Sequence, residues 1–91
     1  MDSITVLYFA GIADITQLGS ETVSLTTLRS TTATDVIHVS DVVDMLIKKY
    51  GNDFEKVANT CMFAVDMDYV PRSHPLKPGQ EMALIPPVSG G

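Results

Sequence analysis

Residues 4–10 form a mostly apolar run of β-branched and aromatic residues without a helix or strand breaker, a pattern that predicts a β-strand. Both faces of this strand are largely apolar: one has Ile4, Val6 and Tyr8, and the other has Thr5, Leu7 and Phe9. A strand that is apolar on both faces lies inside a sheet, or it presents its second face to a partner protein.

Similar short apolar runs predict further strands over residues 21–28, 61–65, 69–70 and 81–85. The run 36–39 fits either a short strand or the lead-in to a helix. Turns are expected at 66–68, where two aspartates occur, and at the Pro78-Gly79 pair.

The strongest helical pattern starts at Ser40, which is a favoured N-cap residue, and ends at Gly51. Its apolar stripe at helical spacing consists of Val43, Leu46, Ile47 and Tyr50. Residues 11–18 predict a short helix closed by Gly19, residues 53–60 predict a further helical turn, and the polar stretch 30–35 predicts a loop.

The predicted elements fit one small domain, because 91 residues are too few for two hydrophobic cores. Their order is strand, helix, strand, long helix, strand, short strand and strand. This order predicts the α+β class, with helices packed on one face of a mixed sheet.

The net charge of −5 makes the chain a poor partner for nucleic acid or anionic lipid, and its six Lys and Arg residues are scattered. The first residues lack the positive charge of a signal peptide, and the first apolar run is too short to span a bilayer. A single cysteine, Cys61, excludes an intramolecular disulfide. We therefore expect a cytosolic protein without nucleic-acid or membrane partners.

The final residues, which follow the last predicted strand, are the most informative segment. The sequence there is Pro86-Pro87-Val88-Ser89-Gly90-Gly91. The two prolines favour an extended exit, and the two glycines make a tip that is thin enough for a narrow channel. Adenylation would convert the carboxylate of Gly91 into an acylating group. Attack by a persulfide would then give a thiocarboxylate, whose sulfur is nucleophilic. A frayed terminus is the alternative interpretation of the same residues.

Together with the preceding Glu81-Met82-Ala83-Leu84-Ile85, this ending resembles the small, sulfur-carrying subunit of molybdopterin synthase. Three further segments resemble that family in the same order: the opening strand and helix up to Gly19, Ala64-Val65-Asp66 with Tyr69-Val70, and His74-Pro75-Leu76. The resemblance is weak between residues 26 and 60. Asp66 stands where the family commonly has Asn, and Pro78-Gly79-Gln80 replaces its usual Asp-Gly-Asp turn.

The resemblance implies a ubiquitin-like β-grasp domain over residues 1–86 and an extended tail over 87–91. Gly91 would carry the thiocarboxylate, and Pro87, Val88, Ser89 and Gly90 would enter the partner. The partners would be the large synthase subunit, in a heterotetramer, and an adenylating and sulfurtransferase enzyme that uses ATP. The large subunit would hold the cyclic pyranopterin phosphate and supply the acid–base groups. This chain would bind no permanent cofactor and no metal, and sulfur at Gly91 would be its only covalent cargo.

The strand pattern also predicts a docking patch on the outer face of the sheet. If Ile4, Val6 and Tyr8 face the helices, an apolar set faces outward: Leu7, Phe9, Tyr69, Ala83 and Ile85. An exposed apolar patch of this kind is typical of a partner site. The alternative is that a loop covers it.

Other reactive residues are assigned structural roles. Cys61 starts an apolar strand, which favours a buried and inert thiol over a nucleophile. His38 and His74 lie far apart and show no zinc-ligand spacing. A turn accounts for Asp66 and Asp68 better than a catalytic carboxylate pair does. Four methionines are expected to fill the core, namely Met45, Met62, Met67 and Met82.

Three other functions stay open at the level of sequence. The first is a sulfur carrier for thiamine synthesis or tRNA thiolation, although the tRNA type typically ends in His-Gly-Gly. The second is a protein modifier that forms an isopeptide bond with lysine. The third is a β-grasp interaction module in which the two terminal glycines have no chemical role.

Overall fold

The computed structural model describes residues 2–32 and 35–87. Its main sheet has five strands in the order β2-β1-β7-β4-β5. The strands are β1 (Ser3–Tyr8), β2 (Ser20–Ser24), β4 (Met62–Val65), β5 (Asp68–Val70) and β7 (Glu81–Ile85). A second pair is formed by β3 (Ile37–His38) and β6 (Pro75–Leu76).

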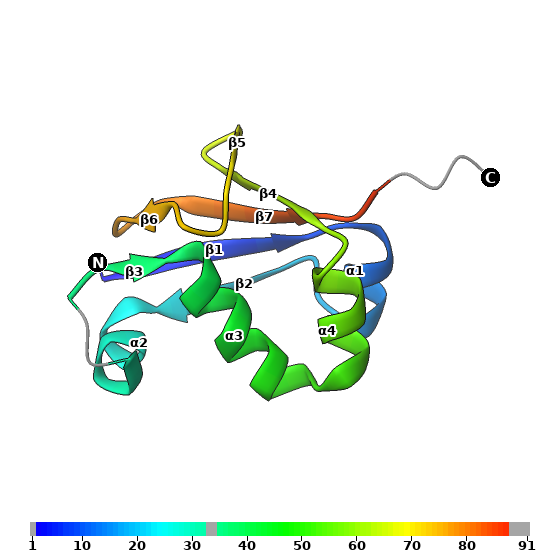
Figure 1. Cartoon of the computed structure of the whole chain (residues 1–91), viewed down its shortest axis with the longest axis horizontal. Helices are drawn as coiled ribbons and strands as arrows, with labels where there is room; N and C mark the ends of the chain where they lie inside the picture. Colours follow the sequence, from blue (N-terminus) through cyan, green and yellow to red (C-terminus); the bar gives the residue numbers. More distant parts are fainter. Residues whose placement is uncertain (1, 33–34, 88–91) are drawn as a thin grey trace.

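Four helices complete the fold: α1 (Ala10–Thr16), α2 (Leu25–Thr32), α3 (Val39–Tyr50) and α4 (Asn52–Ala58). Figure 1 shows α2, α3 and α4 on one side of the sheet, and the β4–β5 hairpin forms the edge of the sheet beyond β7. The α+β class and the arrangement of helices on one face of a mixed sheet are therefore confirmed.

The sheet is mixed because β1 runs parallel to β7 and antiparallel to β2. Strand β7 lies in the centre, antiparallel to β4, which in turn forms a hairpin with β5. Because β7 is central, Pro86 and Pro87 leave the sheet from one of its inner strands.

The core forms between the inner face of the sheet and helices α3 and α4. Ile4, Val6 and Tyr8 are buried, as are Met82 and Leu84 on β7. They meet a set of fully buried helix residues, namely Val42, Val43, Leu46 and Phe54. The alternation predicted for residues 4–9 is thus confirmed, and the side chains of Leu7 and Phe9 are left for the outer face.

The expectation of a strand over 21–28 and a loop over 30–35 is wrong in part. Strand β2 ends at Ser24, and α2 begins at once. The hydroxyl of Ser24 accepts a hydrogen bond from the Thr27 amide at 3.3 Å, close to the start of the helix. Leu25 and Leu28 are both buried, and their spacing of three residues suits one face of a helix as well as the start of a strand alternation.

Two helix ends also differ from the prediction. Helix α1 ends before Gln17, whose φ of 63° is left-handed, so Gln17 and not Gly19 is its C-cap. The N-cap of α3 is His38 and not Ser40, and the His38 amide donates to the carboxylate of Asp41 at 2.8 Å. Gly51 does close α3, with a φ of 92° that favours glycine.

Among the described residues, no helix combines the length and the apolar character needed to cross a membrane. Of the tail expected over 87–91, only Pro87 belongs to the described residues; Val88, Ser89, Gly90 and Gly91 lie outside them.

Candidate functional site

The outer face of the sheet carries a continuous row of side chains across four strands. Leu7 on β1 is in register with Ala83 on β7, Ala83 with Ala64 on β4, and Ala64 with Tyr69 on β5. Because residues in register point to the same face, these four side chains lie beside one another. The row ends in the exposed Tyr69, and Phe9 just beyond the end of β1 is also exposed.

This row forms the floor of a shallow hollow of about 240 Å³, which we call the outer hollow. Its lining residues are Leu7, Phe9, Ala64, Met67, Tyr69, Glu81, Ala83 and Ile85. All five residues predicted for a docking patch are among them. Phe9 is 47% exposed and Tyr69 is 65% exposed, so no loop of the described residues covers the hollow.

Sequence reasoning missed three residues of the outer hollow: Ala64, Met67 and Glu81. The alternation within 61–65 contained the signal for Ala64, since its neighbours Phe63 and Val65 both face the core. Met67 was expected in the core, and this is wrong, because its side chain is 92% exposed in the turn between β4 and β5. Met62 is 56% exposed as well, whereas Met82 is buried as expected.

Among the described residues, the only charged one that lines the outer hollow is Glu81, which is exposed. A second carboxylate, that of Asp66, lies close to it. Asp66 accepts hydrogen bonds from the Glu81 amide at 3.1 Å and from the Gln80 side-chain amide at 3.2 Å. The turn function expected for Asp66 is confirmed, and the edge of the hollow is acidic.

The tail leaves the sheet at the edge of this hollow. Strand β7 ends at Ile85, which lines the hollow; Pro86 is half-buried and Pro87 is exposed. Since β7 pairs with strands on both sides, the point from which the tail departs is held rigidly. A partner seated on the outer hollow would therefore receive the tail from a fixed position.

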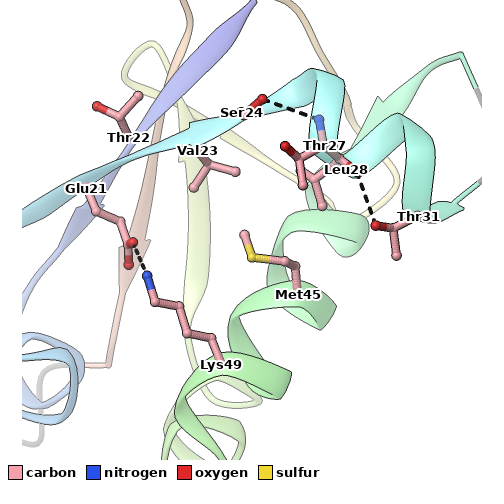
Figure 2. Close-up of a pocket in the computed structure, with 9 residues that line it drawn as sticks. All are labelled: Glu21, Thr22, Val23, Ser24, Thr27, Leu28, Thr31, Met45 and Lys49. Atoms are coloured by element: carbon pink, nitrogen blue, oxygen red, sulfur yellow. Dashed lines mark hydrogen bonds and ion pairs between the residues drawn. The ribbon is translucent and has the colours of Figure 1, made fainter.

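A second, more polar groove lies between β2, α2 and α3 and has a volume of about 180 Å³. Figure 2 shows Met45 and Lys49 reaching from α3 toward β2, where Lys49 meets Glu21. The Lys49 ammonium donates to Glu21 at 2.7 Å, and the hydroxyls of Tyr8 and Tyr50 each donate to Glu21 at 2.5 Å. The ionisable groups at this end are thus engaged in holding β2 to α3.

These contacts shift the pKa values of Glu21 and Tyr8. Burial would raise the pKa of Glu21, but the hydrogen bonds from Lys49, Tyr50 and Tyr8 outweigh it and lower the pKa. Burial, followed by the hydrogen bond to Glu21, raises the pKa of Tyr8 far above its ordinary value. Both groups therefore keep their usual charge states near neutral pH, as suits a structural network.

The surroundings of Cys61 do not favour a reactive thiol. The Cys61 thiol is half-buried and donates to the Val57 carbonyl at 3.3 Å, and burial raises its pKa to about 11. This agrees with the inert function expected for it, since the thiol stays protonated at neutral pH. Within residues 2–32 and 35–87, no three His, Cys, Asp or Glu side chains gather as a metal site would require.

Comparison with known proteins finds relatives that match nearly the whole chain. A model of the ThiS family matches residues 6–91. The molybdopterin synthase sulfur carrier subunit of Chlamydomonas reinhardtii is 34% identical over 90 residues, which cover 97% of this chain and 98% of that protein. The human molybdopterin synthase sulfur carrier subunit is also 34% identical, over 91 residues that cover 97% of this chain and 93% of that protein.

Two solved structures share the fold. Small archaeal modifier protein 1 of Haloferax volcanii superimposes with a TM-score of 0.71 at 19% identity, covering 97% of this chain and 100% of that one. A protein in the complex of subunits 1 and 2 of molybdopterin-converting factor from Helicobacter pylori superimposes with a TM-score of 0.63 at 17% identity, covering 98% and 99%. These likenesses establish the ubiquitin-like β-grasp fold. The two relatives at 34% identity are both sulfur carrier subunits of molybdopterin synthase. Given the family match and these two relatives, the chain belongs to the ThiS family.

Proposed function

We propose that this chain is the sulfur carrier subunit of a molybdopterin synthase. The observation that carries the proposal is the near full-length similarity to two such subunits, at 34% identity. The position of Gly90 and Gly91 just after the central strand β7 supports it, because a thin tip on a rigid base suits insertion into a narrow active site.

The proposed chemistry takes place at the carboxylate of Gly91. An activating enzyme transfers AMP from ATP to this carboxylate and releases pyrophosphate. The terminal sulfur of an enzyme persulfide then attacks the acyl carbon, and AMP leaves. A thiol reduces the resulting acyl disulfide, which leaves a thiocarboxylate on Gly91. The activating enzyme supplies the ATP site, so this chain needs no permanent cofactor of its own.

The acceptor proposed for this sulfur is a cyclic pyranopterin phosphate held by a large partner subunit. The complex of subunits 1 and 2 from Helicobacter pylori includes a protein with the same fold, which supports such a partner here. The outer hollow would seat that subunit, with Leu7, Phe9, Tyr69, Ala83 and Ile85 as contacts. Pro87, Val88, Ser89 and Gly90 would lead Gly91 to the acceptor. We further propose a cytosolic heterotetramer of two carriers and two large subunits.

Intact-mass measurement tests the chemistry directly. The purified chain is incubated with its activating enzyme, ATP and a sulfur source, and a variant that lacks Gly91 serves as the control. We expect the wild-type mass to shift by the exchange of one oxygen for one sulfur and the control mass to stay unchanged. No shift in the presence of an activating enzyme that is competent on another carrier would refute the proposal.

The same experiment, extended to other acceptors, separates the related functions. Transfer of the sulfur to the pterin precursor in the presence of the large subunit supports the synthase. Transfer to a thiamine precursor or to tRNA would identify another kind of carrier. A covalent adduct between Gly91 and a lysine of another protein would identify a modifier. Partner binding that needs neither glycine, with no acyl chemistry, would identify an interaction module.

A further inference from the structure

The turn between β4 and β5 has an unusual backbone for its residues. Val65 pairs with Asp68, so Asp66 and Met67 form a two-residue hairpin loop. Their φ angles are 49° and 76°, both in the left-handed region. Such loops favour Asn-Gly or Asp-Gly, because a side chain at the second position is strained there. Met67 therefore occupies a position at which glycine would be more stable.

Packing within the fold does not compensate for the strained backbone at Met67. Its side chain is 92% exposed, so it contributes almost no buried apolar surface, in contrast to Met82, which is fully buried. The side chain nevertheless lines the outer hollow together with Phe9 and Tyr69. Met67 thus holds a flexible apolar side chain beside an open apolar hollow, at a cost in backbone strain. These features are typical of a residue that contacts a partner protein.

The charges near Met67 indicate the kind of surface it meets. The carboxylates of Glu81 and Asp66 lie at this edge of the hollow, and none of its described lining residues is basic. The whole chain has a net charge of −5. A second copy of this chain would therefore bring like charges together, whereas a protein surface with basic groups would be complementary.

We propose that Met67 is an anchor residue for the partner protein: its side chain enters an apolar pocket of the large subunit, beside basic groups that face Glu81 and Asp66. The inference rests on the proposed function for the identity of that subunit. It assigns Met67 to binding and not to the transfer chemistry, which takes place at Gly91. Removal of its side chain should therefore weaken docking while leaving the fold intact or more stable.

The test compares Met67→Gly with a matched control, Gln17→Gly. Gln17 is also exposed, with a φ of 63°, but it lies at the end of α1 and does not line the outer hollow. Glycine relieves the backbone at both positions, but at Gln17 it also removes an exposed hydrogen bond from the side-chain amide to the Asp14 carbonyl. Thermal unfolding should therefore show a midpoint equal to or above that of the wild type for Met67→Gly and close to that of the wild type for Gln17→Gly. Titration calorimetry with the large subunit should show affinity at least about tenfold weaker for Met67→Gly and unchanged for Gln17→Gly.

A second variant tests whether the partner surface is basic. Glu81→Lys should weaken binding and reduce the dependence of affinity on salt, because it removes attraction to a basic surface. If Glu81→Lys binds as well as the wild type, the assignment of a basic partner surface is wrong.

Four outcomes decide the proposal. Weaker binding of Met67→Gly, with Gln17→Gly unaffected, supports it. Affinity of Met67→Gly within about twofold of a wild type that does bind overturns the inference and leaves the proposed function standing. No binding of the wild-type chain to the large subunit overturns both. A dimer of the chain alone that Met67→Gly abolishes would show that the hollow meets a second copy, and would also overturn the assignment.

Discussion

The Glu21 network offers the sharpest test of how strands β1 and β2 are held to helix α3. Three donors converge on one carboxylate: the hydroxyls of Tyr8 and Tyr50 and the ammonium of Lys49. The Glu21 side chain is only 13% exposed, so water compensates poorly for a lost contact. Replacement by glutamine, Glu21→Gln, keeps the shape, removes the charge and turns one acceptor into a donor that faces Lys49.

The expected cost follows from these contacts. A hydrogen bond to a charged group contributes about 1.5–3 kcal/mol, and the Lys49 contact is half-exposed and worth less. Loss of the charge weakens the two tyrosine contacts without abolishing them, because the amide oxygen still accepts. We therefore expect Glu21→Gln to lower the free energy of unfolding by about 2–3 kcal/mol near neutral pH.

The stability difference between the wild type and Glu21→Gln should depend on pH. Because the folded chain lowers the pKa of Glu21, its contribution is present above the unfolded pKa of about 4.3 and is lost as the pH falls through the lower folded value. The difference between wild type and Glu21→Gln should thus shrink in acid. Urea unfolding followed by circular dichroism, at about pH 7 and about pH 3, measures it.

The control variant is Glu55→Gln, since Glu55 is exposed on α4. We expect it to change the unfolding free energy by less than about 0.5 kcal/mol at both pH values. The reasoning is refuted if Glu21→Gln behaves like this control near neutral pH. A loss of stability that is equally large in acid would mean that the donor introduced by the amide, and not the lost charge, accounts for it.

Two further predictions concern the sulfur atoms. Dilute hydrogen peroxide should oxidise Met67 and Met62 to sulfoxides well before Met82, because their exposed fractions are 92%, 56% and 0%. Peptide mapping by mass spectrometry measures the order of oxidation, and early oxidation of Met82 would contradict its buried position. Iodoacetamide near neutral pH should leave Cys61 largely unmodified until urea unfolds the chain, because burial raises the pKa of the thiol to about 11. Rapid labelling of the folded chain would contradict the assignment of Cys61 as an unreactive thiol.

Several features could be predicted from the sequence because they depend on local pattern. Strand β7 has the predicted bounds, since the paired prolines that follow Ile85 cannot continue a ladder. The two faces of β1 were visible in residues 4–9, and Leu7 and Phe9 of the outer hollow followed from them. Tyr69, Ala83 and Ile85 followed from the other predicted strands. The family resemblance came from short motifs at both ends of the chain and was confirmed by the comparisons.

Other features were decided by tertiary structure. Val23, Leu25 and Leu28 suit a strand or a helix equally well by periodicity, and only packing against β1 and α3 makes α2 helical from Leu25 onward. A methionine is apolar by type, so pattern alone placed Met67 in the core. The register of β4 with β5 places it instead in a hairpin loop, where its side chain is exposed. Sequence by itself therefore determined the class and the family, whereas the make-up of the outer hollow was decided by how the strands align.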